Sequence, residues 1–341
     1  MLYTVYGHLL TSPFDLPVLP VAGGPTAEAA PHITIRLDER ATPVAVWDTD
    51  DRTGAIARRT EGTVEAAGGV VGVDCVDGGC AAAEVDDPWL RVGRCPDGFV
   101  LRFGQRVSFW VSNDASRIVV HARAPVSDAV QHLLIDQVVP LALAHAGALV
   151  LHGSGVLIDG QTVALFGPSG TGKSTLTASL AECGSGVLAD DALVIEPRGS
   201  AGERVALAYP AYPGLRVWPD VLPAGAPPAA APFVADYTEK RRVALAASRF
   251  VAEPRPLRRL YLLEPDEAPS PRITRLSKRA AVMAILTHSY VLDAGDASRL
   301  SAQLVTACAV LDAADVRAIS FPRDLERLAE VRAALRHDLA S

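Results

Sequence analysis

The segment that most constrains this chain is a glycine-rich loop at residues 167–174, which follows an apolar stretch and precedes a helix-forming one. Its residues match the pattern G-x-x-x-x-G-K-[ST] at every position. In this pattern the loop amides and the helix N-terminus point at one anionic centre, and glycines permit a close approach that side chains would block. The motif predicts a phosphate-binding loop made of Gly167, Pro168, Ser169, Gly170, Thr171, Gly172, Lys173, Ser174 and Thr175.

Two side chains of this loop have predicted roles. Lys173 is expected to lie along the β- and γ-phosphates of a nucleoside triphosphate. The Ser174 hydroxyl is expected to enter the coordination shell of Mg²⁺, which prefers oxygen ligands. ATP and Mg²⁺ are therefore the expected ligands. The structural alternative is a glycine-rich turn that binds nothing, and the complete match in a strand–loop–helix context disfavours it.

A second acidic element follows at residues 186–191, where an apolar run ends in two carboxylates, Asp190 and Asp191. They stand 17 and 18 residues after Lys173, which leaves room for the helix after the loop and one returning strand. Both carboxylates are then expected beside the phosphates, where one binds the metal and the other accepts the proton of an attacking hydroxyl. A helix cap or turn built from the same residues stays open as the structural alternative.

Other classes of protein are disfavoured by what the sequence lacks. An ABC transporter ATPase carries an LSGGQ-type signature, and a GTPase carries N-K-x-D; neither occurs here. The net charge of −7 disfavours a nucleic-acid partner. The N-terminus has no basic region ahead of an apolar one, so no signal peptide is expected. No membrane span is expected either, because the longest apolar run, 133–151, contains Asp136, Gln137, Pro140 and His145.

The five cysteines fit an intracellular chain. Their number is odd and the chain is long enough to fold without disulfide bonds, so the cytoplasm is the expected location. Only Cys75 and Cys80 are close together in the sequence. A lone C-x4-C pair with no second pair or histidines nearby does not predict a zinc site.

The spacing of apolar residues predicts an α/β chain of two domains. Residues 1–126 form a β-rich domain, with strands expected at 3–9, 32–37, 99–103, 107–111 and 117–122. A helical pattern opens the second domain, 127–341. Strands are expected there at 148–158, 162–166 and 257–263, and helices at 280–292, 298–313 and 324–339. A Pro- and Ala-rich surface loop is expected at 219–232.

In combination these motifs resemble a known family. Leu151-His152-Gly153 precedes the loop, which starts 15 residues after the histidine, and the L-A-D-D run follows closely. Together they resemble the catalytic domain of the HPr kinase/phosphorylase family, whose fold is related to phosphoenolpyruvate carboxykinase. The resemblance covers roughly residues 127–324. It implies a P-loop kinase that transfers phosphate from ATP, with Mg²⁺, to a serine hydroxyl.

The resemblance also implies roles for single residues. His152 matches the family's active-site histidine and Asp190 its catalytic base, and Lys173 matches the lysine of its phosphate-binding loop. The family's E-I-R-G-L-G segment, whose glutamate helps to hold the metal, corresponds to 211–216, which has no carboxylate. Asp191 is therefore the expected substitute ligand. A buried structural histidine stays open as the alternative for His152.

A subgroup of the family is more similar still. The opening LYTVYGHLLTSPFDLPVLP, the runs QHLLIDQVVP and YPGLRVWPD, and a Lys-Arg-Arg cluster resemble the HPr kinase homologues of lasso-peptide biosynthesis. This resemblance implies that the partner is a precursor peptide, phosphorylated on its C-terminal serine. The N-terminal domain is expected to help to recognise that peptide. The family's kinase/phosphorylases assemble as oligomers, which leaves a homo-oligomer open here.

The most basic run in this acidic chain is Lys240, Arg241 and Arg242, after the Pro- and Ala-rich loop. Cations at this place are expected to offset the charge of the transferring phosphoryl group or to bind a carboxylate of the substrate. Arg216 is a lesser candidate for the same role. A solvated turn stays open as the structural alternative.

Three other functions stay open at this point. The first is an HPr-type protein serine kinase/phosphorylase that acts on a folded carrier, although the missing glutamate counts against it. The second is a small-molecule kinase of the same fold. The third is a regulatory protein that binds nucleotide without turnover. Consumption of ATP only in the presence of a hydroxyl acceptor would separate the enzymes from this last class.

Overall fold

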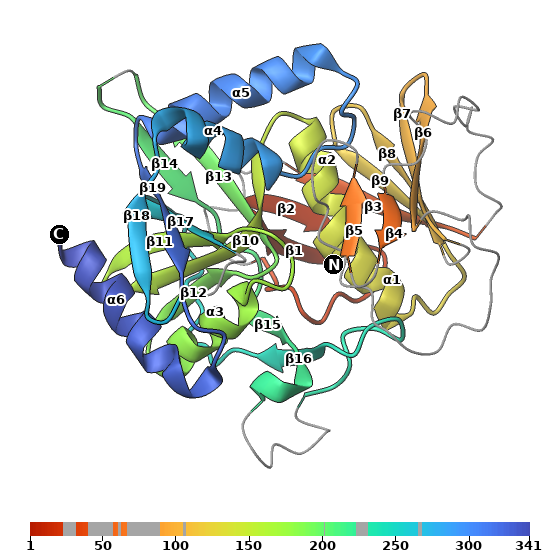
Figure 1. Cartoon of the computed structure of the whole chain (residues 1–341). Helices are drawn as coiled ribbons and strands as arrows, with labels where there is room; N and C mark the ends of the chain where they lie inside the picture. The colour runs from red at the N-terminus through yellow and green to blue at the C-terminus, as the bar shows by residue number, and fades with distance from the viewer. Residues whose placement is uncertain are drawn as a thin grey trace.

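The computed structural model describes residues 1–22, 32–39, 57–60, 63–66, 89–104, 107–200, 202–222, 231–264 and 268–341. Two large sheets with helices around the second make up this part of the chain (Figure 1), so the α/β class is confirmed. Cys75 and Cys80 lie outside the described residues. Free thiols are present at Cys95, Cys183 and Cys308.

The N-terminal part forms a seven-stranded sheet in the order β1-β2-β3-β9-β8-β7-β6. Its strands are β1 (Leu2–Val5), β2 (His8–Thr11), β3 (His32–Asp38), β6 (Leu90–Cys95), β7 (Gly98–Phe103), β8 (Val107–Ser112) and β9 (Arg117–His121). β4 (Ala57–Thr60) and β5 (Thr63–Ala66) pair with each other. The strands predicted from residue 32 to residue 122 are confirmed.

The single strand predicted at 3–9 is wrong, because the chain reverses at Tyr6-Gly7 and forms the β1–β2 hairpin. Both residues have positive φ, 52° and 77°, as a two-residue turn that matches the twist of its strands requires. A Cβ at Gly7 would lie 2.4 Å from the ring of Tyr209. The hairpin turn is thus packed against the second half of the chain.

A helical segment joins the two halves. Ser127 caps α1 (Asp128–Leu133), and one turn of π-helix, η2 (Leu134–Val138), leads into α2 (Val139–His145). This wider turn lies next to Pro140, whose nitrogen cannot donate a helical hydrogen bond. The turn places Asp136 in the interior, with 1 % of its surface exposed. The helical pattern predicted from Ser127 is confirmed.

The second sheet closes on itself, since β11 pairs with both β10 and β17. Its path is β11-β10-β13-β14-β17-β19-β18, and β12 pairs with β10. The strands are β10 (Leu149–Ile158), β11 (Gln161–Phe166), β12 (Gly186–Ala189), β13 (Ala192–Arg198), β14 (Val205–Ala208), β17 (Arg255–Leu263), β18 (Arg272–Arg275) and β19 (Asp315–Ser320). β15 (Gly214–Val217) and β16 (Arg241–Ala244) form a separate pair. The three strands predicted here are confirmed.

Helices lie on both sides of this sheet. α3 (Lys173–Glu182) and α6 (Leu328–Ala340) are neighbours on one side, and α4 (Lys278–Thr287) packs against α5 (Ala297–Leu311) on the other (Figure 1). The short turns η3 (Pro219–Val221) and η5 (Leu325–Arg327) complete the list. The helices predicted at 298–313 and 324–339 are confirmed. The helix predicted at 280–292 ends five residues early, because Ser289 and Tyr290 pair with β10 instead.

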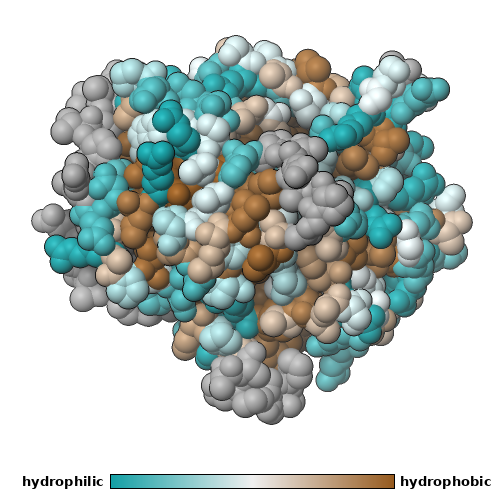
Figure 2. Space-filling model, turned by 180° about the vertical axis from the view of Figure 1, so that it is seen from behind, coloured by the Kyte–Doolittle hydropathy of each residue, from teal (hydrophilic) through white to brown (hydrophobic). Residues whose placement is uncertain are grey.

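The main cluster of buried apolar residues runs through both halves of the chain. It includes Leu10 and Phe109 from the first sheet and Leu134 and Leu193 from the second half. The boundary predicted at residue 126 stays a prediction, since the two parts share this core. From behind, apolar patches cross the middle of the surface between hydrophilic areas (Figure 2). No helix in the described part of the chain has the length and apolar character needed to cross a membrane.

Candidate active site

The loop of residues 167–172 connects β11 to α3, in the strand–loop–helix order that the motif predicts. Gly167, Gly170 and Gly172 have φ angles of 143°, 75° and 90°, which L side chains rarely adopt. A Cβ at Gly167 would lie 2.6 Å from the carbonyl oxygen of Leu263 on β17, whereas Gly170 has open space around it. The loop is thus fixed to the sheet at its start and open at its tip, as a phosphate cradle requires.

The side chain of Lys173 folds back along this loop. Its Nζ donates hydrogen bonds to the carbonyl oxygens of Gly167 at 3.0 Å and Pro168 at 2.8 Å. The Thr171 hydroxyl donates to the same Pro168 oxygen at 2.8 Å. Lys173 is only 7 % exposed. Its ammonium group is therefore held at the mouth of the loop, where phosphate oxygens could replace these carbonyls.

A cavity of about 300 Å³ opens on the loop, a volume at the lower end of small-molecule sites. Its floor is the loop itself, from Ser169 to Thr175. One wall, here called the charged wall, carries His152, Asp191, Trp218, Asp220 and Lys240. The other, here called the apolar wall after Phe321, Pro322, Leu325 and Leu328, also carries Arg323 and Asp324.

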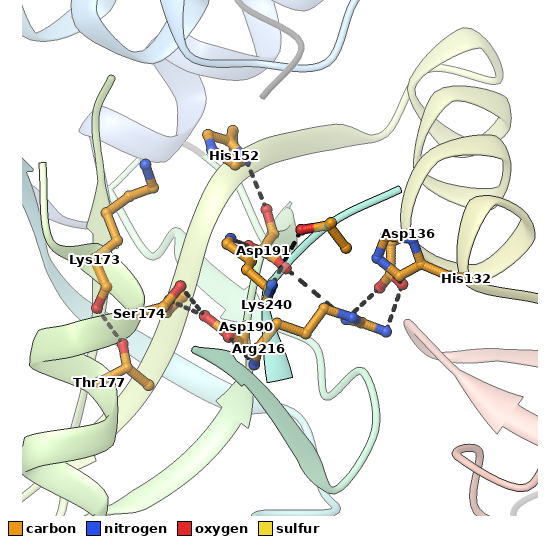
Figure 3. Close-up of polar contacts among 12 residues, drawn as sticks. His132, Asp136, His152, Lys173, Ser174, Thr177, Asp190, Asp191, Arg216 and Lys240 are labelled. Carbon is orange, nitrogen blue, oxygen red and sulfur yellow. Dashed lines mark hydrogen bonds and ion pairs between the residues drawn. The ribbon is translucent and has the colours of Figure 1, made fainter. Parts of the chain in front are cut away.

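Asp190 is buried beside the loop, directly after β12. Its Oδ1 accepts hydrogen bonds from the hydroxyls of Ser174 at 3.2 Å and Ser154 at 2.8 Å (Figure 3). Its Oδ2 accepts one from the backbone amide of Arg216 at 2.9 Å. Burial, and then the charge of Asp191, raise the pKa of this carboxyl. The predicted approach of this carboxylate to the loop serine is present in the structure.

Asp191 faces the cavity instead. Its φ of 66° is unusual for a residue with a side chain, a kind of backbone strain that is often found at functional sites. Its Oδ1 lies 3.7 Å from Nζ of Lys240, and its Oδ2 lies 3.9 Å from Nη1 of Arg216. Its carbonyl oxygen lies 3.0 Å from Nδ1 of His152. Because a carbonyl oxygen only accepts hydrogen bonds, this contact requires a hydrogen on Nδ1 and leaves Nε2 as the acceptor nitrogen of the neutral ring.

The fit of this site to Mg²⁺ depends on Ser174, Asp190 and Asp191. In the part of the chain that the structure describes, no group of three or more His, Cys, Asp or Glu side chains could hold a metal ion. A nucleotide-bound Mg²⁺ needs only one or two carboxylates, because phosphates and water complete its shell. A hydroxyl and two carboxylates beside the loop therefore fit a metal that arrives with the nucleotide.

The three predicted cations of the basic run point to different places. Lys240 lines the cavity and is 7 % exposed. The guanidinium of Arg241 lies 3.6 Å from the centre of the Phe233 ring. Arg242 donates to the carbonyl oxygen of Val234 at 3.2 Å. Of this run, the structure brings Lys240 to the site, and it engages the two arginines with the preceding segment.

Arg216 lies behind the two carboxylates, where it pairs with Asp136 (Figure 3). Its Nη1 and Nη2 lie 2.7 Å and 2.5 Å from the two oxygens of Asp136. The Tyr212 hydroxyl donates to the same carboxylate at 2.8 Å, and His132 lies 3.4 Å from it. Burial raises the pKa of Asp136 to about 7 although Arg216 opposes this shift. Arg216 thus fixes Asp190 through its backbone and is itself fixed by Asp136.

Sequence reasoning missed Asp136 as a member of this site. It was noted only as a charged residue that interrupts an apolar run, and its spacing from the loop follows no motif. The N-terminal hairpin was missed as well. Tyr6 is 1 % exposed, and its amide donates to the carbonyl oxygen of Pro210 at 2.9 Å. Burial, and then the charge of Asp136, raise the pKa of its phenol, and its amide contact fixes the hairpin turn to the segment before β15.

The class that this fold and site define is a mixed α/β protein in which a glycine-rich loop, a lysine and the carboxylate of Asp191 line one cavity, with the buried carboxylate of Asp190 beside the loop. No family model and no curated protein matches the chain. Among solved structures, the HPr(Ser) kinase/phosphatase from Coxiella burnetii is similar, with 14 % sequence identity and a TM-score of 0.30. The match covers 55 % of this chain and 95 % of that one. A similarity at this score does not define function, which must come from the site.

Proposed function

We propose that this chain is an ATP-dependent kinase that phosphorylates a serine hydroxyl, and that the serine ends a lasso-peptide precursor. The observation that carries the proposal is the hydrogen bond between Ser174 and Asp190, with Asp191 beside it on the cavity. It sets two carboxylates next to the loop that would hold the phosphates. A protein that only binds nucleotide needs one of them for the metal, whereas a kinase also needs a proton acceptor.

Binding of the donor would use the loop and the start of α3. The amides of residues 169–175 and the ammonium group of Lys173 would meet the phosphate oxygens, which carry most of the charge. Mg²⁺, held by Ser174 and a carboxylate of the pair, would offset the remaining charge. Asp190 accepts a hydrogen bond from the Ser174 hydroxyl and so keeps it in place before the metal arrives. Ser154 in turn donates a hydrogen bond to Asp190.

Transfer would take place at the charged wall. The acceptor hydroxyl gives its proton to a carboxylate of the pair while its oxygen bonds to the γ-phosphorus. The bond from this phosphorus to the bridging oxygen breaks, and ADP leaves with the electron pair. Lys240, 3.7 Å from Asp191, would offset charge on the phosphoryl group in flight. His152 stands on the same wall and is oriented by the carbonyl of Asp191.

Two divisions of roles between the carboxylates follow from the chemistry. The family resemblance implies Asp190 as the proton acceptor, with Asp191 as the substitute metal ligand, and the raised pKa of Asp190 suits a base. The burial of the two side chains favours the opposite assignment, with Asp190 as the metal ligand and Asp191 as the proton acceptor. Asp190 is 1 % exposed and touches Ser174, whereas Asp191 lines the cavity in which an acceptor would stand.

Mass spectrometry after incubation with MgATP tests the proposal. Peptides that end in serine, matched peptides that end in alanine and a folded HPr-like carrier are offered in parallel. We expect phosphate on the terminal serine alone and none with the Asp190→Asn/Asp191→Asn double variant. Phosphate on the carrier would instead identify a protein serine kinase. No transfer despite tight MgATP binding would identify a nucleotide-binding protein without turnover.

A further inference from the structure

The apolar wall of the cavity comes from the segment that follows β19. Because β11, β17 and β19 are parallel neighbours, their carboxyl ends lie at the same edge of the sheet. The glycine-rich loop leaves this edge after β11, and residue Phe321 leaves it after β19. The topology thus sets a second segment, far along the chain, against the loop on the side away from Asp190.

Where this wall meets the loop, at Phe321, it is apolar and firmly supported, although Arg323 and Asp324 also line the cavity on this side. The Phe321 ring lies 4.0 Å from the position that a Cβ would take at Gly172, and the residue is 7 % exposed. On its other side, Phe321 packs on a core cluster that includes Leu176 and Val331. Leu325 is 48 % exposed and lines the same cavity, so apolar surface is left at its rim.

The two walls match the two ends of a nucleoside triphosphate. Its phosphates are charged and suit the loop and the charged wall, where Asp191 and Lys240 stand. Its nucleoside carries a flat aromatic base, which gains most from a phenyl ring and aliphatic side chains. When the terminal phosphate points to Asp191, the nucleoside must extend across Gly172 to the other side of the cavity, where Phe321 stands.

We propose that Phe321, Leu325 and Leu328 bind the nucleoside of the phosphoryl donor, with its purine base against the Phe321 ring. This inference rests on the proposed function, because it assigns the end of the donor that the phosphate-binding loop does not hold. Trp218, on the charged wall, is then left to the acceptor side of the cavity.

Calorimetric titration with two probes tests this assignment. MgATP carries a nucleoside and magnesium tripolyphosphate does not. Phe321→Ala is expected to weaken MgATP binding about tenfold, as loss of base–aromatic stacking does, and Leu325→Ser by a smaller factor. Both variants are expected to bind tripolyphosphate like the wild type. Leu304→Ser is the matched control, because Leu304 is a leucine of similar exposure, 42 %, on α5.

Leu325→Ser keeps the test informative if Phe321→Ala misfolds, since Leu325 is largely exposed and Phe321 is not. Unchanged MgATP affinity in both variants would overturn the inference. So would an equal fall in tripolyphosphate affinity, or a selective loss of MgATP affinity in Trp218→Ala alone. Failure of the wild type to bind either probe would contradict the proposed function itself, which separates the two failures.

Discussion

The two walls of the cavity are built in opposite ways. On the charged wall, Asp191 and Lys240 are held by ion pairs that lead back through Arg216 to Asp136. On the apolar wall, Phe321 belongs to a core cluster under α6, against which Leu328 also packs. The first wall is set by electrostatics among buried groups, and the second by close packing. Substitutions on the first are therefore expected to change the chemistry, and those on the second the affinity for the donor.

The largest expected effect comes from the carboxylate pair. Asp190→Asn and Asp191→Asn keep the shape of each side chain but remove its charge. The variant at the proton acceptor is expected to slow transfer by about 10²- to 10⁴-fold at any Mg²⁺ concentration. The variant at the metal ligand is expected to regain rate as Mg²⁺ rises. Initial rates against Mg²⁺ concentration separate the two, and wild-type rates in both variants would refute a chemical role for the carboxylate pair.

The ion pair behind the charged wall gives the next effect. Asp136→Ala removes the closest partner of the Arg216 guanidinium, which is 2 % exposed, and leaves it with Asp191 at 3.9 Å. The free energy of unfolding is expected to fall by about 3–5 kcal/mol, as it does when one member of a buried pair is removed. Urea denaturation measures this loss. The double variant Asp136→Leu/Arg216→Met is the control and is expected to recover much of it; no recovery would mean that the charge is not the cause.

The loop between the walls offers a matched pair of glycines. Gly170→Ala adds a methyl group to open space at a φ of 75°, which costs about 1–2 kcal/mol of backbone strain. Gly167→Ala also places a side chain at positive φ, 143°, and in addition sets a Cβ 2.6 Å from the Leu263 carbonyl oxygen. Thermal denaturation is expected to show the larger loss for Gly167→Ala. Equal losses would show that the loop is not seated on β17.

The smallest effect concerns His288, which stands near Lys173. Burial, and then the charge of Lys173, lower the pKa of His288 to about 4, whereas an unfolded histidine titrates near pH 6.5. The unfolded state therefore binds more protons between these values, so the stability that His288 contributes is present above about pH 6.5 and is lost as pH falls towards 4. Between pH 7 and pH 5, the free energy of unfolding of His288→Leu, measured by urea denaturation, is expected to rise relative to that of the wild type. A difference that is the same at both pH values would contradict this.

Much of the fold was readable from the sequence, because it rests on local patterns. The alternating and apolar runs that became β10, β11 and β17 are short-range signals. The prediction of one strand at 3–9 was wrong because a tyrosine has no local preference for the positive φ that Tyr6 adopts. Tyr6 adopts it because its amide bonds to Pro210 and Gly7 fits against Tyr209, and both contacts lie across the fold.

The residues of the site also fall into those that a local pattern predicts and those that it does not. The glycine-rich loop and the Asp190-Asp191 pair are close in sequence, so a motif could predict that they meet. Asp136 and Phe321 reach the site only through a π-helical turn and the end of a distant parallel strand. No spacing rule connects either to the loop. The partners of a buried charge and the second wall of a cavity are properties of the closed sheet, and only the structure shows them.

The most direct test of the account measures MgATP affinity and phosphate transfer together in Lys173→Ala and Asp190→Asn. In the proposed function Lys173 serves both binding and transfer, whereas Asp190, when it is the proton acceptor, serves transfer alone. We predict that Asp190→Asn binds MgATP within a few-fold of the wild type and transfers little, and that Lys173→Ala loses both. Equal loss of binding in the two variants would contradict the claim that Asp190 acts in the transfer step rather than in binding.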